Sequence, residues 1–248
     1  MRVDGIVVRK PAQLVGPGAA LDVADPAADF VGRGAAKLLA ALADFHLDPS
    51  GRTAVDLGAS TGGFTQVLLR AGASKVFAVD VGHDQLAPAV AHDPRVVELS
   101  GVHVRDVTTL AALAPCDFIV ADLSFISVTA AFPVLGLLLG PDTDAVVLIK
   151  PQFEAGPAAL DGRGVVTDEE IRVGAVERVL TMAMEHGFGI YGVTPCAVPG
   201  EHGNREVFAW LRADPEAEGL PPSAISRAVR QDGVVCAQPR LPRPESRP

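Results

Sequence analysis

The chain has 248 residues, a formal net charge of -9 at pH 7, 48% hydrophobic residues and 21% charged residues. This balance is typical of a folded chain with one large domain, and it argues against extensive disorder. It also argues against binding nucleic acid over the whole surface, which requires an excess of Lys and Arg, although a local basic patch remains compatible with it.

The first 25 residues form short apolar runs interrupted by Pro and Gly. They predict part of a small β-sheet rather than a domain with its own core, and residues 26–30 are expected to be a linker. The N-terminus has no apolar stretch of the kind found in a signal peptide. The longest apolar stretch, at 125–140, contains a proline and is too short for a membrane span, so no membrane association is expected.

From residue 32 onward, helical and strand patterns alternate, which is typical of a parallel sheet covered by helices on both faces. The pattern predicts helices at 32–48, 62–72, 83–93, 108–113, 128–140 and 167–187, and strands at 52–60, 75–81, 95–100, 116–124 and 144–150. The last of these helices is expected to begin with Thr167 as its N-cap and to end at Gly187.

Two further strands are expected at 188–198 and 205–212, with no helix between them. Such a pair predicts an antiparallel strand near one edge of the sheet. The main domain is therefore placed at 31–213. Residues 214–248 are expected to be a partly disordered tail that contains one helix, at 223–232.

A glycine-containing loop, GASTGG, follows the first strand of the main sheet, and the next strand ends in Asp80. Glycines let the backbone approach a ligand closely, and a carboxylate at the tip of the neighbouring strand can bind both hydroxyls of a ribose. The loop lacks the G-x-G spacing of dinucleotide-binding folds, so S-adenosylmethionine is favoured over a dinucleotide. The alternative is a simple strand-to-helix turn with a solvated acid.

Four ionisable residues are expected near the carboxyl ends of the strands, where open α/β sheets bind ligands. Asp122 and Lys150 end strands, Glu206 begins the antiparallel strand, and Lys37 lies on the helix before the first strand. Each alone is usually a solvated strand or helix terminus. Together, two lysines and two carboxylates would form a charge network in which pairing makes burial tolerable.

Several motifs resemble those of one enzyme family. VDLGASTGGFTQVLLRAGASKVFAVDVG, DFIVADLSFIS, LIKPQFEAG and GNREVFAWL look like the TlyA (haemolysin A) family of ribosomal RNA 2′-O-methyltransferases, a part of the FtsJ-like enzymes that use S-adenosylmethionine. The match runs in order from about residue 30 to 211. It implies a Rossmann-like class I methyltransferase fold with a mostly parallel seven-stranded sheet, helices on both faces and one antiparallel strand near the edge.

The resemblance also implies site residues. The family's catalytic Lys-Asp-Lys-Glu pattern corresponds to Lys37, Asp122, Lys150 and Glu206, with Lys150 deprotonating or orienting the ribose 2′-hydroxyl, Asp122 and Glu206 holding Lys150, and Lys37 placing the ribose. Together with the loop and its acid, it assigns the cofactor S-adenosyl-L-methionine to a set of ten residues. These are Asp56, Gly58, Ala59, Ser60, Gly62, Gly63, Asp80, Val81, Asp122 and Phe125.

The chain departs from the family in four places. The family's N-terminal S4 RNA-binding domain is represented only by residues 1–25, which resemble its closing strands. GRGAAK replaces a more usual Ser and Gly-Gly around Lys37, and His83 and His103 stand where Tyr and Asn are typical. We interpret the two histidines as sequence drift rather than as functional residues.

The expected partner is ribosomal RNA or a ribosomal subunit, and no metal is expected because no metal-ligand cluster is visible. The three cysteines are far apart, which fits a reducing, cytoplasmic setting. Three alternatives remain at this point. They are a methyltransferase with another substrate, a non-catalytic RNA-binding protein and a membrane-active haemolysin, the last disfavoured because no membrane span or strongly basic amphipathic helix is present.

Overall fold

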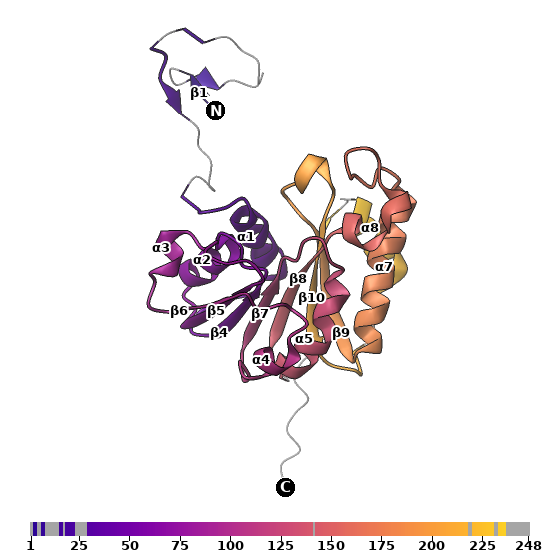
Figure 1. Cartoon of the computed structure of the whole chain (residues 1–248). Coiled ribbons are helices and arrows are strands. Elements are labelled where there is room, and N and C mark those ends of the chain that lie inside the picture. The colour runs from indigo at the N-terminus through magenta and orange to yellow at the C-terminus, as the bar shows by residue number, and fades with distance from the viewer. Residues whose placement is uncertain are drawn as a thin grey trace.

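The computed structural model describes residues 2–3, 6–7, 15–16, 18–22, 29–140, 142–217, 220–230 and 233–236. Its main feature is an eight-stranded sheet with the order β11-β9-β10-β8-β7-β4-β5-β6 (Figure 1). Strands β8, β7, β4, β5 and β6 are parallel neighbours. Their carboxyl ends therefore share one edge of the sheet, as the alternating pattern predicts.

The five parallel strands are short apolar segments. They span Thr53–Leu57 (β4), Lys75–Asp80 (β5), Val96–Ser100 (β6), Phe118–Ala121 (β7) and Asp144–Ile149 (β8). Every residue of β7 and β8 is buried, which explains why these segments read as continuous apolar runs rather than as alternating ones.

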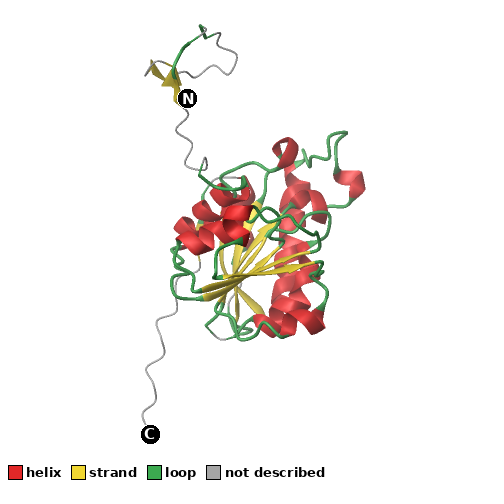
Figure 2. Ribbon diagram, turned by 60° about the vertical axis from the view of Figure 1, so that its left-hand side comes forward, coloured by secondary structure: helices red, strands yellow, loops and turns green. Residues whose placement is uncertain are grey.

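Helices cover both faces of this sheet (Figure 2). One core packs beneath α1 (Gly34–Phe45), α2 (Gly63–Arg70) and α3 (Pro88–Ala91). The other packs beneath α4 (Val107–Ala111), α5 (Phe132–Leu138), α7 (Glu169–Glu185) and α8 (Pro222–Arg230). Short helical turns complete the connections at η1 (Val128–Ala131), α6 (Pro151–Glu154), η2 (Pro157–Ala159) and η3 (Glu201–Gly203).

The antiparallel part of the sheet consists of β9 (Phe188–Pro195), β10 (Val207–Ala213) and β11 (Val235–Cys236). Strand β10 lies between β8 and β9 and is antiparallel to both, so its first residues meet the carboxyl ends of the parallel strands. The seven expected strands are all present. The two-residue strand β11 adds an eighth, antiparallel to β9 at the sheet edge.

Two segments flank the main sheet. Near the N-terminus, β1 (Arg2–Val3), β2 (Ile6–Val7) and β3 (Leu21–Asp22) form a three-stranded antiparallel sheet, as expected for this region. Past residue 213, α8 buries Ile225 and Val229 in the core, so this part of the expected tail is folded. Most of the expected linker and the residues after 236 lie outside the described residues.

The longest helix, α7, begins one residue later than the sequence predicts. Asp168, not Thr167, is its N-cap, and its carboxylate accepts hydrogen bonds from the backbone N–H groups of Glu170 and Ile171. Aspartate at this position also interacts favourably with the positive end of the helix dipole, which explains why it displaces the neighbouring threonine.

Candidate active site

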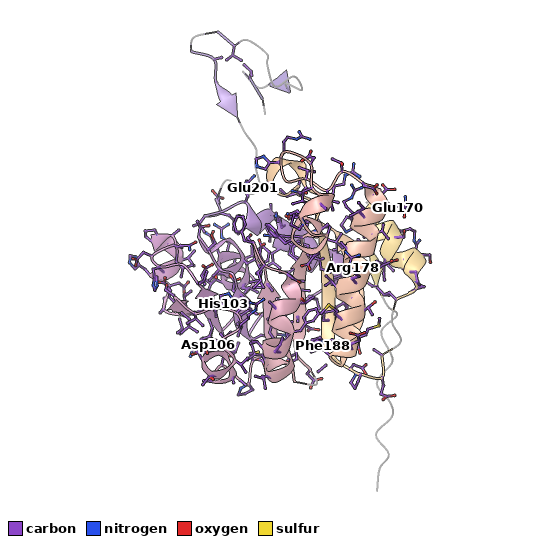
Figure 3. The ribbon with its side chains drawn as sticks, turned by 45° about the vertical axis from the view of Figure 1, so that its right-hand side comes forward. His103, Asp106, Glu170, Arg178, Phe188 and Glu201 are labelled. Atoms are coloured by element: carbon purple, nitrogen blue, oxygen red, sulfur yellow. The ribbon has the colours of Figure 1, made fainter. Side chains whose placement is uncertain are left out.

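A cavity of about 630 Å³ opens at the carboxyl edge of the parallel strands. The loops after β4, β7 and β8 contribute to its walls, together with the start of α1 and the loop that precedes β10. Figure 3 shows Glu201, from the last of these loops, at one end of the sheet and Phe188, which starts β9, toward the other. The cavity is therefore where the topology places a ligand site.

The glycine loop after β4 turns sharply at one end of this cavity. Gly58 has φ 87°, and a Cβ atom there would lie 2.5 Å from the carbonyl oxygen of Asp122. Gly62 has φ 92°, and a Cβ atom there would lie 2.9 Å from Val90 Cγ1. Both positions therefore require glycine, and the loop lies directly against the strand end that carries Asp122.

Asp80 fixes the loop from the neighbouring strand. One of its carboxylate oxygens accepts from Ser60 N at 2.8 Å, and the other accepts from Gly82 N at 2.8 Å and from Gln85 Nε2 at 3.3 Å. A carboxylate has about four lone-pair sites, so it can still accept from a ligand. Beside it, Val81 is apolar and 63% exposed.

Asp56 lies beneath the loop and is fully buried. It accepts a hydrogen bond of 2.6 Å from Thr65 Oγ1, and its other oxygen has no hydrogen-bond partner among the described residues. Burial raises the pKa of Asp56 to about 7, because an unpaired carboxylate is costly away from water. Asp56 does not line the cavity, so it supports the loop from below.

The four residues of the expected catalytic pattern meet as two ion pairs. Lys150 Nζ lies 2.6 Å from Asp122 Oδ1, and Lys37 Nζ lies 2.5 Å from Glu206 Oε2. All four line the cavity. Glu206 was expected to hold Lys150 and instead pairs with Lys37, because Lys37 on α1 approaches the start of β10 from across the sheet edge.

The two pairs differ in character. Burial lowers the pKa of Lys37, but the charges of Glu206 and Asp122 outweigh it and leave the pKa above its ordinary value, so Lys37 is a charged donor at neutral pH. Lys150 donates a hydrogen bond of 2.7 Å to Ser124 Oγ. Among the described residues Asp122 Oδ1 accepts no hydrogen bond of good geometry, although it lies 2.6 Å from Lys150 Nζ. Lys150 is therefore held by an ion pair to Asp122 and a hydrogen bond to Ser124.

The loop after Lys150 contributes residues whose role could not be predicted from the sequence. Gln152 Nε2 donates to Glu206 Oε1 at 2.9 Å. Glu154 accepts from Ser127 Oγ at 2.6 Å and from Val128 N at 2.8 Å, which ties this loop to the one after β7. The signal was present in the polar residues of PQFE, but only the fold shows what they contact.

Phe125 has an unusual conformation for an aromatic residue. Its side chain is 88% exposed, and its backbone has φ 63°, a left-handed value that costs about 1–3 kcal/mol in a non-glycine residue. Its ring lies 5.3 Å from that of Phe153, centroid to centroid, and both rings line the cavity. The structure thus holds an aromatic pair beside Lys150, in which Phe125 is exposed and Phe153 is half-buried.

The expected cofactor residues fall into two groups. Those that line the cavity are Gly58, Ala59, Ser60, Gly63, Asp122 and Phe125. Asp56 and Gly62 support the loop, while Asp80 and Val81 lie at the end of β5, beside the cavity rather than in its wall. This arrangement fits S-adenosylmethionine, because Asp80 offers acceptors for a ribose diol and Val81 an apolar surface for adenine.

Comparison with known proteins identifies the family. Residues 30–213 match the FtsJ-like methyltransferase family. The chain belongs to this family. The TlyA protein of Mycobacterium tuberculosis, a 16S/23S rRNA (cytidine-2′-O)-methyltransferase, is 43% identical over 93% of this chain and 88% of its own length. Hemolysin A of Brachyspira hyodysenteriae is 35% identical over 73% of this chain and 75% of its own.

Two solved structures share the fold. A protein from Lactococcus lactis that carries the hemolysin name has 37% identity and a TM-score of 0.77, covering 83% of this chain and 99% of its own. An S-adenosylmethionine-dependent methyltransferase from Mesorhizobium loti has 20% identity and a TM-score of 0.50, covering 72% and 98%, which supports the fold alone. Among the described residues, none of the helices has the length and apolar character that crossing a membrane demands.

Proposed function

We propose that this protein transfers a methyl group from S-adenosylmethionine to a ribose 2′-hydroxyl of ribosomal RNA. The observation that carries the proposal is the pair of lysine–carboxylate contacts, Lys37–Glu206 and Lys150–Asp122, in one cavity beside the glycine loop. The cytidine-2′-O activity of the M. tuberculosis relative supports the same reaction and substrate class.

The cofactor is held by the glycine loop and its neighbours. Ala59 and Ser60 line the cavity, Asp80 would accept hydrogen bonds from the ribose hydroxyls, and Val81 would pack against the adenine. When bound, S-adenosylmethionine supplies an electrophilic methyl group on a sulfonium. Because this donor is already activated, the protein contributes mainly by bringing the target oxygen within about 3 to 3.5 Å of the methyl carbon.

The two lysines have different roles. Lys37 remains protonated because Glu206 and Asp122 raise its pKa, so it donates to the ribose and fixes its position. Lys150 either orients the 2′-hydroxyl as an ammonium ion or, as a neutral amine, accepts its proton while the oxygen bonds to the methyl carbon and the bond from that carbon to sulfur breaks. Asp122 and Ser124 hold the amine in place, and the Asp122 carboxylate stabilises the ammonium that proton transfer produces. Base catalysis by a positioned group contributes on the order of 10² to 10⁴ in rate.

The aromatic pair fits the base of the target nucleotide better than it fits the cofactor. Phe125 lies beside Phe153, and the centroid of the Phe153 ring is 5.8 Å from Lys150 Nζ. The exposed ring of Phe125 offers a stacking surface next to the proposed catalytic lysine. Stacking of an unpaired base on an aromatic side chain contributes about 1–3 kcal/mol. The sequence assigned Phe125 to the cofactor, and its position by Lys150 favours the RNA.

The RNA backbone needs positive charge that the whole molecule, at -9, does not supply. Arg33 and Arg163 line the same cavity and are exposed, and Arg163 also pairs with Asp161, so these two guanidinium groups offer local positive charge to phosphates near the lysines. Contacts of this kind position the phosphates without reading the sequence. We place the reaction on ribosomal subunits in the cytoplasm.

Transfer of a tritiated methyl group to ribosomal subunits tests the proposal. Wild-type protein should label a ribose 2′-oxygen, and Lys150→Ala should lower the rate by roughly 10² to 10⁴ while the Kd for S-adenosylmethionine changes less than about twofold. The exposed residue Arg227 on α8 gives a matched control, Arg227→Ala, which should transfer normally. Labelling of a base, or equal transfer by Lys150→Ala, contradicts the proposal.

A further inference from the structure

The side-chain amide of Gln152 has one end bound and one end unbound. Its Nε2 donates to Glu206 Oε1 at 2.9 Å. Its Oε1 is buried and has no hydrogen-bond partner in the described part of the chain, yet the residue lines the cavity. A buried amide oxygen without a partner is costly, so this atom points to a ligand that supplies a donor.

The orientation of this amide follows from chemistry. Oxygen and nitrogen of a glutamine amide are often assigned only by their surroundings. Here Glu206 Oε2 pairs with the protonated Lys37, so the carboxylate is ionised and can only accept. The atom that faces Glu206 Oε1 must therefore be the NH₂ group, and the free atom must be the carbonyl oxygen.

Other buried acceptors in the cavity are already paired. Both carboxylate oxygens of Glu206 hydrogen-bond to Lys37 or Gln152. Among the described residues Asp122 Oδ1 accepts no hydrogen bond of good geometry, but it lies 2.6 Å from the charged Nζ of Lys150, whereas Gln152 Oε1 has neither a donor nor an ion-pair partner. Gln152 precedes Phe153 in α6, both residues line the cavity, and the Gln152 amide bonds to Glu206 of the Lys37 ion pair. This is where the proposed function puts the target nucleotide.

We propose that Gln152 Oε1 accepts a hydrogen bond from the target nucleotide and is a positioning residue for it. The inference rests on the proposed function. An internal nucleotide has two kinds of donor in reach of such a site. One is the ribose 2′-hydroxyl, because the 3′-oxygen of an internal nucleotide is esterified to phosphate and has no hydrogen to donate. The other is an exocyclic amino group such as N4 of cytidine.

Two substitutions separate this role from simple support of Glu206. Gln152→Lys keeps a donor for Glu206 and removes the acceptor, whereas Gln152→Met removes both. If Oε1 binds the nucleotide, both variants should lower kcat/KM for RNA by about 10- to 100-fold, with the Kd for S-adenosylmethionine within about twofold. If Gln152 acts only through Glu206, Gln152→Lys should retain near-normal transfer while Gln152→Met does not, which overturns the inference.

A double-mutant cycle identifies the donor. The probes are three synthetic rRNA fragments. One contains the unmethylated target cytidine, one has uridine in its place, and one has 2′-deoxycytidine in its place. The Kd of each fragment is measured for wild type and for Gln152→Lys. A tenfold or greater loss with uridine in wild type but not in the variant assigns the amino group. The same pattern with 2′-deoxycytidine assigns the hydroxyl. Equal losses in both proteins for both probes overturn the inference.

Wild-type methyl transfer to the unmodified fragment is scored first in the same preparation. Its absence counts against the proposed function. Its presence, together with a cycle that shows no coupling to Gln152, counts against this inference alone.

Discussion

At the scale of single residues, the buried acid Asp56 beneath the glycine loop makes the free energy of unfolding depend on pH. Its carboxylate contacts Thr65 alone, and burial raises its pKa to about 7 from an ordinary value near 4. The folded state therefore binds a proton more tightly than the unfolded chain does. For this group the free energy of unfolding is highest below about pH 4, falls as pH rises toward 7, and is constant above that.

Asp56→Asn should remove this dependence, because the amide resembles the protonated acid. Relative to wild type, the variant should gain roughly 2 kcal/mol in the free energy of unfolding between pH 5 and pH 8. Urea unfolding at the two pH values measures the difference. An Asn variant whose stability relative to wild type is the same at both pH values would show that Asp56 is already ionised at pH 5.

At the scale of elements, a second charge cluster holds the opposite end of the sheet together. Asp144, at the start of β8, is buried and binds Arg52 Nη1 at 2.6 Å, Arg212 Nε at 2.7 Å and Trp210 Nε1 at 2.8 Å. These partners come from β10 and from the residue before β4. One carboxylate thus links three strand ends far from the catalytic cavity.

Asp144→Asn should lower the free energy of unfolding by about 3 kcal/mol, because it leaves two guanidinium groups without their buried partner. Asp93→Asn is the matched control, since Asp93 pairs with Arg95 at a partly exposed site and such pairs contribute about 1 kcal/mol or less. Urea unfolding of both variants gives the comparison. Equal effects would mean that the Asp144 cluster is no more important than a surface pair.

The sequence predicted the elements well because burial imposes clear patterns on them. Strands β7 and β8 read as apolar runs since every residue in them is buried. Boundaries were less certain, as Asp168 shows by capping α7 in place of Thr167. The pairing of Glu206 with Lys37 could not be predicted either, because it depends on how α1 crosses the start of β10, a contact between segments 169 residues apart.

At the scale of the whole molecule, the domain extends beyond residue 213, where the family match ends. Helix α8 packs against α7 and β9 and buries Ala224, Ile225, Ala228 and Val229. Arg230 adds ion pairs with Glu169 and Glu170 on α7. A helix was expected at 223–232, but the sequence did not indicate that its apolar residues complete one of the two cores.

Ile225→Ala should therefore lower the free energy of unfolding by about 3 kcal/mol, through lost burial and the cavity that the smaller side chain leaves. Arg227→Ala, on the exposed side of the same helix, should change it by less than about 0.5 kcal/mol. Thermal unfolding of the two variants decides the point. A negligible effect of Ile225→Ala would assign α8 to a loosely attached tail.

The position of β10 also determines when the protein becomes competent during its own synthesis. Strand β10 pairs with β8 on one side and β9 on the other, and both precede it along the chain. A nascent chain that ends before residue 206 can form the glycine loop and the Lys150–Asp122 pair, but it lacks the carboxylate that binds Lys37 and Gln152. Insertion of β10 between two earlier strands is a non-local step, which slows folding. The last contacts of the proposed catalytic site therefore form late, after most of the chain has been synthesised.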